Sequence, residues 1–192
     1  MTTELQAMAR AILVNAQHYE WSLQGMGLLR LHLAGNCRLH VWDRRYRVPG
    51  VSMIHDHLQW ALKSTVISGR LVNRRYYDFG LGTFDKATHL FATIKPGYGT
   101  FFKHEPKPVI LACRGDEEYL PGQSYSQSPS EIHETDADDG TVTIMMKTPT
   151  SDESARVFWP AGEEWGSAEP RIASAMEVKS IVDNALANWT GA

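Results

Sequence analysis

Apolar residues follow a helical spacing at both ends of the chain and a strand-like spacing in the middle. An i, i+3, i+4 repeat predicts an amphipathic helix over about residues 3–16, and a similar repeat after Pro170 predicts one over about 170–189. Neither helix carries an obvious catalytic or metal-binding group on its apolar side. We therefore expect both helices to cover a sheet.

Between the helices, β-prone runs alternate with turn residues. The segments 28–33 and 37–42, separated by Ala-Gly-Asn, predict a hairpin, and much of 80–128 is expected to be a loop that forms a lid. Many short strands with frequent turns favour an antiparallel sandwich or barrel. We expect a single domain over residues 1–192 with its barrel core over about 28–160. The further strands are predicted over 64–79, 109–112, 131–135, 141–148 and 156–159.

Composition narrows the classes of function. Of the 192 residues, 43% are hydrophobic and 21% are charged, as in ordinary globular proteins, and the net charge of −3 argues against nucleic-acid and anionic-membrane partners. No apolar run approaches the roughly 20 residues of a membrane-spanning helix, and the first residues lack the pattern of a secretory signal. We expect a cytoplasmic protein. Hydrolase and nucleotide-binding motifs are missing from the sequence.

The segment 52–60, Ser-Met-Ile-His-Asp-His-Leu-Gln-Trp, holds the most informative motif. In a strand, His55 and His57 point to the same face and lie roughly 6.6 Å apart. Two imidazoles at this spacing can bind one metal ion at about 2.1 Å. Gln59 follows on the same face, and Asp56, Leu58 and Trp60 are expected to face the other side. At this point the alternative interpretation, that the two histidines are a structural or surface pair without a metal, remains open.

A third histidine and two turns extend this motif. Gly69 is expected to turn the chain into the next strand, and His133 lies on a short strand after Pro129. This order of His-x-His, glycine and a distant histidine resembles the motifs of the cupin superfamily, over about residues 28–150. The resemblance implies a mainly β fold, the cupin double-stranded β-helix (jelly-roll) barrel, with flanking N- and C-terminal helices. It also implies one mononuclear metal ion bound by His55, His57 and His133.

The departures from the cupin pattern narrow the comparison. Many cupins have a glutamate shortly after His-x-His, where this chain has Ala-Leu-Lys over 61–63. The remaining three-histidine set is similar to that of the thiol dioxygenases, which oxidise thiols to sulfinates. Imidazole ligands with open positions suit Fe(II), which we favour, although Zn, Ni and Mn also accept imidazole. By the same resemblance, Arg30 falls near the arginine that binds the substrate carboxylate, and we take it as a candidate catalytic residue.

The thiol dioxygenase family has a Ser-His-Tyr set on its last strand, at the positions of Thr143, Met145 and Lys147 here. Cysteine is therefore not implied as the substrate. We expect an Fe(II)-dependent dioxygenase that takes dioxygen and a small organic molecule. A non-catalytic metal- or ligand-binding cupin, and a cupin isomerase or epimerase, are the alternatives.

Other residues are weaker candidates. Arg38 is a second candidate for binding an anion, and Trp60 and Tyr125 are candidates for lining a pocket or for packing. The hairpin at 28–42 can pair with a second subunit or cover the edge of its own barrel, so a homodimer remains an open alternative. His32 and His40 lie on the two arms of that hairpin, where they are expected to face each other. The histidines outside the motif are expected to be structural or exposed, with His104 a remote candidate for a fourth ligand: His18, His32, His40, His89 and His104.

Overall fold

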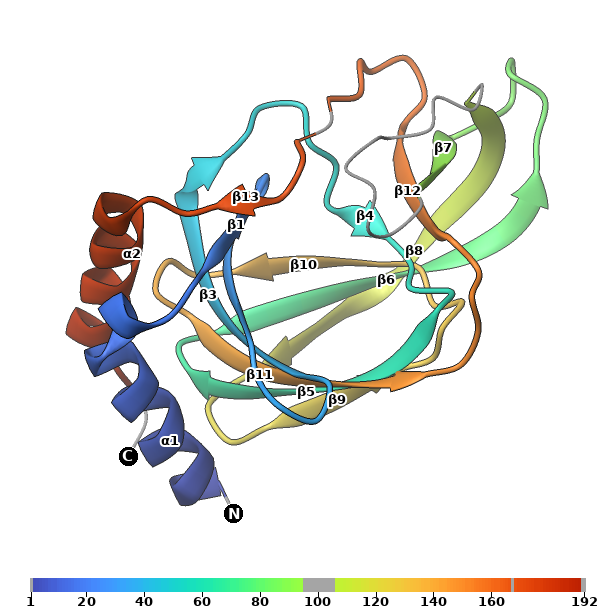
Figure 1. Ribbon diagram of the computed structural model, residues 1–192. Helices are drawn as coiled ribbons and strands as arrows, with labels where there is room; N and C mark the ends of the chain where they lie inside the picture. The colour runs from blue at the N-terminus through green and yellow to red at the C-terminus, as the bar shows by residue number, and fades with distance from the viewer. Residues whose placement is uncertain (1, 95–105, 167, 191–192) are drawn as a thin grey trace.

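The computed structural model describes residues 2–94, 106–166 and 168–190, and it shows a mainly β protein with a helix at each end (Figure 1). His104 lies outside the described residues. In chain order the elements are α1 (Thr2–Val14), η1 (Ala16–His18), β1 (Ser22–Gln24), β2 (Met26–His32), β3 (Cys37–Arg47), β4 (Ile54–His55), β5 (Trp60–Ser68), β6 (Leu71–Leu81), β7 (His89–Ile94), β8 (Lys107–Tyr119), β9 (Ser124–Gln127), β10 (His133–Ala137), β11 (Val142–Pro149), β12 (Ala155–Pro160), β13 (Arg171–Ile172) and α2 (Ala175–Ala187).

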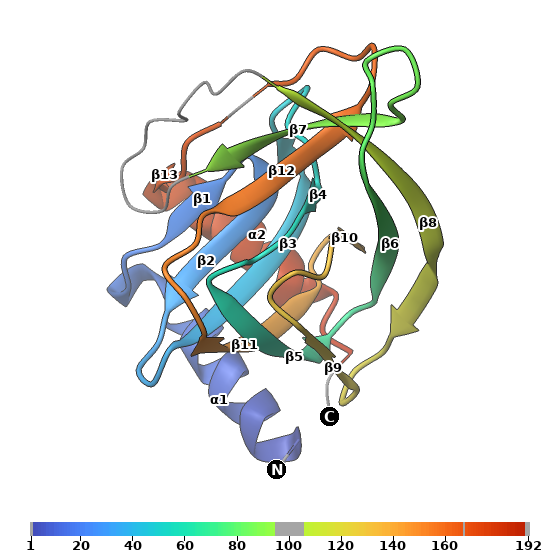
Figure 2. The same ribbon diagram turned by 90° about the vertical axis from the view of Figure 1, so that its right-hand side faces the viewer.

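The strands of the described residues divide into two groups. Seven form a sheet in the order β13-β1-β2-β3-β11-β5-β9, which we name the helix-side sheet. Six others close into an antiparallel barrel in the order β10-β4-β12-β7-β8-β6, which we name the strand ring. Figure 2 shows β7 and β12 side by side across one part of this ring and β6 and β8 along another. The prediction of a mainly β barrel with flanking helices is confirmed, and the architecture is compatible with a cupin-like fold.

Strict alternation along the helix-side sheet separates its two faces. Leu29 and Leu31 of β2, with Leu39 and Val41 of β3, pack with both helices in one buried apolar cluster, because alternate side chains of a strand point to opposite faces. The even-numbered residues of the same stretches, 28–30 and 38–42, therefore face the interior between the helix-side sheet and the strand ring. The helices lie on the outer side of this sheet (Figure 1). The buried residues that contribute to this outer cluster from β2, β3 and β11 are Leu29, Leu31, Leu39, Val41, Val142 and Ile144.

The C-terminal helix begins at Ala175 rather than at the predicted position after Pro170. Ser174 caps it, and the side chain of Glu177 accepts a hydrogen bond from the Ser174 backbone N–H in a capping box. The residues before the cap, 171–172, pair with β1 as the short strand β13. In the described part of the chain, no helix is long and apolar enough to cross a membrane.

The prediction of a loop over most of 80–128 is wrong. Strand β6 runs on to Leu81, and β7, the long strand β8 and β9 occupy much of the remainder. The acidic run Asp-Glu-Glu at 116–118 reads as a loop in the sequence. In the structure it pairs with β6, where Asp116 binds Arg74 and Glu118 binds Arg70. Cross-strand ion pairs of this kind stabilise a strand that has few apolar residues.

Gly69 makes the predicted turn between β5 and β6. Its φ of +82° lies in the left-handed region that favours glycine. A Cβ atom at this position would lie 2.5 Å from Thr141 Oγ1. The hydroxyl of Thr141 donates to the carbonyl of Arg70 at 2.9 Å, which fixes the neighbouring chain closely against the turn. Both the backbone angle and the available space therefore require glycine here.

Candidate metal centre

His55, His57 and His133 come together inside the barrel, although almost 80 residues separate the first from the last in sequence. Strand β4 pairs with β10, and His55 lies directly opposite His133 in that pairing. The ring centroids are 4.6 Å apart for His55–His57, 4.4 Å for His55–His133 and 5.2 Å for His57–His133. One nitrogen from each ring lies within 4.8 Å of those of the other two.

Two of the three rings are oriented by backbone carbonyls. His55 Nδ1 lies 2.8 Å from the Met53 carbonyl oxygen, and His133 Nδ1 lies 3.3 Å from that of Glu131. Because a carbonyl can only accept, each Nδ1 carries the proton and donates. The Nε2 lone pair of each ring is then available to a metal. A hydrogen bond from the ring nitrogen that does not bind the metal fixes the tautomer and the orientation of a metal-binding histidine.

His57 lies outside the strand that the sequence analysis predicts for both histidines. Strand β4 ends at His55, and the His57 N–H donates to the Pro129 carbonyl at 3.2 Å. Its ring stacks on Trp60 with a centroid distance of 5.3 Å and an interplanar angle of 25°. The prediction that Trp60 faces away from the histidines is therefore wrong, because the strand alternation ends at His55. The predicted convergence of the two imidazoles therefore depends on this stack and this hydrogen bond, in addition to strand alternation.

The residue between the two histidines anchors the segment to the neighbouring strand. The side chain of Asp56 is fully buried and accepts hydrogen bonds from the Arg156 backbone N–H at 2.7 Å and from Arg156 Nε at 2.6 Å. The Asp56 N–H in turn donates to the Arg156 carbonyl at 3.0 Å. The guanidinium lies over the rings of Phe91 and Phe158. Asp56 thus points away from the imidazoles, as predicted, and holds them against β12.

Burial keeps the three histidines neutral. It lowers the pKa of His55 and holds the pKa values of His57 and His133 well below their usual range, with His55 adding to the effect on both. Neutral imidazole is the form that binds metal, so protons compete weakly at this site. The chemistry of the donor set fits a transition-metal ion, because three nitrogens at about 2.1 Å from one ion need only small ring rotations from these positions.

Across the described residues, this is the one cluster of three or more histidine, cysteine or acidic side chains within metal-binding distance. The structure thus brings together three histidines and no carboxylate at this position. A set of three protein ligands leaves coordination positions for other molecules. The identity of the metal does not follow from the geometry, since imidazole accepts iron, zinc, copper and nickel.

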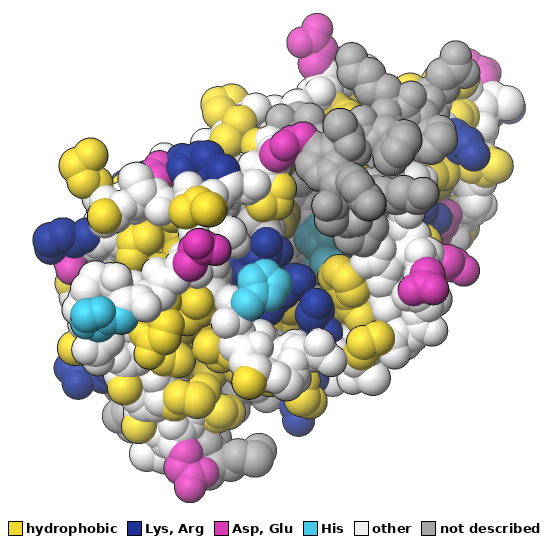
Figure 3. Space-filling model, in the orientation of Figure 1, with side chains coloured by type: hydrophobic (Ala, Val, Ile, Leu, Met, Phe, Trp, Pro, Cys, Tyr) yellow, Lys and Arg dark blue, Asp and Glu magenta, His cyan; other side chains and the backbone are white. Residues whose placement is uncertain are grey.

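A cavity leads to the three histidines. We use the name site cavity for an outer chamber of about 390 Å³ and a connected inner chamber of about 80 Å³, which share His55, His57, Arg30 and Arg38 in their walls. Figure 3 shows Lys, Arg and His side chains gathered in a hollow on this face of the molecule. The outer chamber has the size of pockets that bind small molecules.

Arg30 points into this cavity. Its Nε donates to Ser22 Oγ at 3.1 Å, and its neighbour across the β2–β3 pair is His40. Arg30 belongs to the even-numbered face of β2, opposite the leucines that pack under the helices. Of the weaker candidates, Arg38, Trp60 and Tyr125 also line the site cavity.

His40 lies in the wall of the inner chamber, where it is not predicted from the sequence. His40 does not face His32 as predicted, because the hairpin register pairs His40 with Arg30 and His32 with Arg38. The His40 ring is buried in the inner chamber, and burial lowers its pKa to about 3. The alternation Arg38, His40, Trp42 against Leu39 and Val41 is the signal that identifies this wall from sequence.

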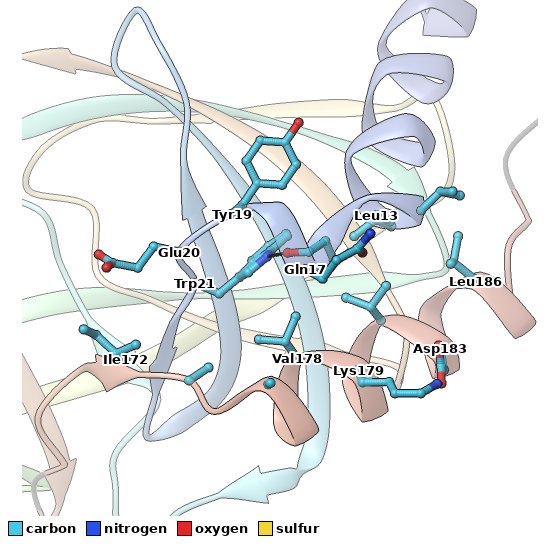
Figure 4. A pocket seen from close by; sticks show the side chains of 15 residues that line it. Leu13, Gln17, Tyr19, Glu20, Trp21, Ile172, Val178, Lys179, Asp183 and Leu186 are labelled. Atoms are coloured by element: carbon cyan, nitrogen blue, oxygen red, sulfur yellow. Dashed lines mark hydrogen bonds and ion pairs between the residues drawn. The ribbon is translucent and has the colours of Figure 1, made fainter.

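A second hollow lies elsewhere and carries no cluster of metal-binding side chains among the described residues. A groove of about 540 Å³ lies between the end of α1, the segment from η1 to Trp21, and α2, on the outer side of the helix-side sheet (Figure 4). Leu13, Trp21, Val178 and Leu186 are among its mainly apolar walls. Its charged groups include the exposed ion pair Lys179–Asp183. Volume alone therefore does not identify the site, whereas the converging histidines do.

Comparison with known proteins adds no family assignment. No family model matches the chain, and a search of curated proteins gives no significant match. The assignment of a candidate metal centre therefore depends on the three histidines and their surroundings.

Proposed function

We propose that the protein is a cupin-type, mononuclear non-haem iron dioxygenase that oxidises a small organic molecule. The observation that carries this proposal is the buried three-histidine set without a carboxylate, at the base of a cavity of small-molecule size. Bound Fe(II) would supply a centre for dioxygen activation, with positions left for substrate and dioxygen. The open positions and the adjacent cavity favour chemistry over a purely structural ion.

The surrounding residues have defined tasks in this proposal. The carbonyls of Met53 and Glu131 orient His55 and His133 for binding iron. Trp60 holds the third imidazole by stacking and forms a wall that limits access of water. The guanidinium of Arg30 orients an anionic group of the substrate, because its planar fork can bind a carboxylate through two hydrogen bonds.

The resemblance to thiol dioxygenases suggests a thiol as one substrate class, in which both atoms of dioxygen add to sulfur and form a sulfinate. Thr143 and Met145 line the inner chamber at two positions of that family's Ser-His-Tyr set. A methionine cannot relay a proton, so we infer that the substrate differs from cysteine. The proposed activity is therefore defined by the iron and dioxygen chemistry, and the substrate class needs a separate argument.

Oxygen uptake tests the proposal. Protein purified without oxygen and loaded with Fe(II) is mixed with small thiols and carboxylates in an oxygen-electrode cell, next to His133→Ala and the matched control His18→Ala. His18 is exposed in η1. We expect substrate-dependent oxygen loss with the wild type and the control, and at least a hundredfold slower loss with His133→Ala. Ligand binding without turnover would support the binding-protein alternative, and turnover without oxygen would support an isomerase. Either outcome contradicts the proposal.

A further inference from the structure

Three cationic side chains gather beside the candidate metal centre. Arg30 and Arg38 line the site cavity, and Lys147 lies against Trp60, which lines it as well. Among the described residues, no carboxylate lies within ion-pair distance of any of the three. Buried arginines elsewhere in the fold are compensated, as in the pairs of Arg156 with Asp56 and of Arg75 with Glu131. The charge of this cavity wall is therefore unbalanced.

Trp60 connects these cations to the histidines. The guanidinium carbon of Arg38 lies 5.6 Å from the centroid of the Trp60 ring, and Lys147 Nζ lies 4.7 Å from it. The same indole stacks on His57. A ligand that contacts Arg38 and Lys147 is therefore within one ring's width of the candidate metal centre.

Three neighbouring strands present the cations on one face. Arg30 is on β2, Arg38 is on β3, and Lys147 is on β11 two residues beyond Met145, which lies opposite Arg38. The even-numbered residues 28–30 of β2 and 38–42 of β3 face the cavity, as do Thr143 and Met145 of β11. Lys147 follows Met145 in the same alternation and lies against Trp60. The arrangement follows from strand register and does not depend on a loop conformation.

Arg30 and Arg38 are largely buried, and Lys147 is partly buried. Like charges that have no counter-ion among the described residues are costly where burial removes them from water. Burial, followed by the charge of Arg30, lowers the pKa of Arg38 to about 10. Burial lowers the pKa of Lys147 too, with Arg38 and Arg30 adding to the effect. Arg38 still carries its charge at neutral pH. An anionic ligand offsets this repulsion and regains the hydrogen bonds that the cations lost on leaving water.

Buried polar atoms without hydrogen-bond partners also indicate a ligand in the site cavity. Within the described structure, Arg38 Nε, His40 Nε2, Trp42 Nε1 and Trp60 Nε1 are buried and make no hydrogen bond. Arg38, His40 and Trp42 are neighbours on one face of β3 and line the inner chamber. Buried donors are normally paired, so several orphans in one wall indicate a polar occupant. Three of these atoms can only donate, which suits an acceptor-rich anion.

We propose that the ligand of the site cavity is a small organic dianion, a dicarboxylate or an equivalent molecule with two anionic groups. Arg30 binds one group, and Arg38 together with Lys147 binds the other over the face of Trp60. The inference deepens the proposed function, on which it rests for the role of the ligand as substrate. The family resemblance implies only the arginine at position 30, and a single carboxylate there leaves Arg38 and Lys147 without a counter-ion.

Calorimetric titration of metal-free protein tests this proposal. The probes are malonate, succinate, glutarate and adipate, with butyrate as the monoanion. The variants are Arg38→Gln and Lys147→Gln, with Lys63→Gln as the matched control, since Lys63 is exposed on the helix-side sheet. We expect at least one dicarboxylate to bind tenfold or more tightly than butyrate. Each cavity variant should lose about tenfold to a hundredfold of that affinity, because hydrogen bonds to charged groups are lost.

Two results overturn the inference: butyrate binding as tightly as every dicarboxylate, or dicarboxylate affinity that is unchanged in both cavity variants. Absence of dicarboxylate binding to the wild type does so as well. Thermal melting of each variant verifies folding. Lys147→Gln is expected to fold, because Lys147 lies partly exposed near the end of β11. The metal-free titration separates this test from the proposed function. Dicarboxylate binding by a protein that binds no iron would contradict the proposed function alone.

Discussion

Replacing Asp56 with asparagine removes the charge that anchors the His-x-His segment to β12. Asp56 is fully buried, and its two oxygens accept from the backbone N–H and the Nε of Arg156. An asparagine can keep the bond to the backbone N–H, but its NH₂ group then faces the guanidinium, which is a donor. The buried pair is broken, and the partner's charge is left without its main counter-ion.

The magnitude follows from the exposure of the two partners. Loss of one partner of a buried ion pair costs about 3–5 kcal/mol. The Arg156 side chain is 22% exposed and has Asp78 at 3.5 Å as a second partner, and burial already raises the pKa of Asp56 against the effect of Arg156. We therefore take the lower end, about 3 kcal/mol, which corresponds to a fall in Tm of about 6–12 °C for a chain of this size.

Thermal melting and metal titration together check this prediction. Asp56→Asn is expected to lose about tenfold to a hundredfold in metal affinity, as for other outer-shell substitutions. Asp78→Asn is the matched control, because Asp78 contacts the same guanidinium from a position that is 34% exposed, and should lower stability by less than about 1 kcal/mol. A melting temperature of Asp56→Asn within 2 °C of the wild type, with metal affinity retained, would refute the reasoning.

Two further predictions concern stability. Burial lowers the pKa of His40 to about 3, whereas the pKa of a histidine in an unfolded chain is about 6.5. Between these two pH values, His40 is therefore protonated in the unfolded chain and neutral in the folded protein. Stability should fall as pH drops below about 6.5, with His40 contributing about 1.4 kcal/mol per pH unit below 6. Urea titrations at pH 7, 6 and 5 should show a shallower fall for His40→Gln, and an identical slope contradicts this. Gly69→Ala should lower the free energy of unfolding by about 1–3 kcal/mol, because residue 69 has a φ of +82° and a Cβ atom there would contact Thr141. A variant that melts at the wild-type Tm would contradict this prediction.

The sequence predicts the parts of this protein that depend on local periodicity. The apolar repeat of α1, the hairpin of β2 and β3 and the turn at Gly69 follow from spacing and turn residues alone. The grouping of His55 and His57 follows only in part, because His57 lies beyond β4 and is held by its stack on Trp60. The participation of His133 follows from the family resemblance, since no local rule relates it to a segment almost 80 residues away.

The features that the sequence does not predict depend on long-range pairing. The acidic end of β8 becomes a strand because Arg74 of β6 lies opposite Asp116, and Arg70, directly before β6, pairs with Glu118. The two residues of β13 form a strand because β1 offers an unpaired edge. For the same reason Arg38 and Lys147 cannot be assigned to a cavity from sequence. Alternation shows that they lie opposite an apolar face, but only the packing of the helices shows which face is inside.

Metal content of the protein as purified without oxygen tests the central claim most directly. Elemental analysis of the wild type, His55→Ala, His133→Ala and the control His18→Ala compares two ligands from different strands with an exposed histidine. We predict about one equivalent of a transition metal per chain in the wild type and in the control, and loss of that metal in both ligand variants. A wild type without metal, or a His133→Ala variant that keeps its metal, would contradict a centre shared by the three histidines.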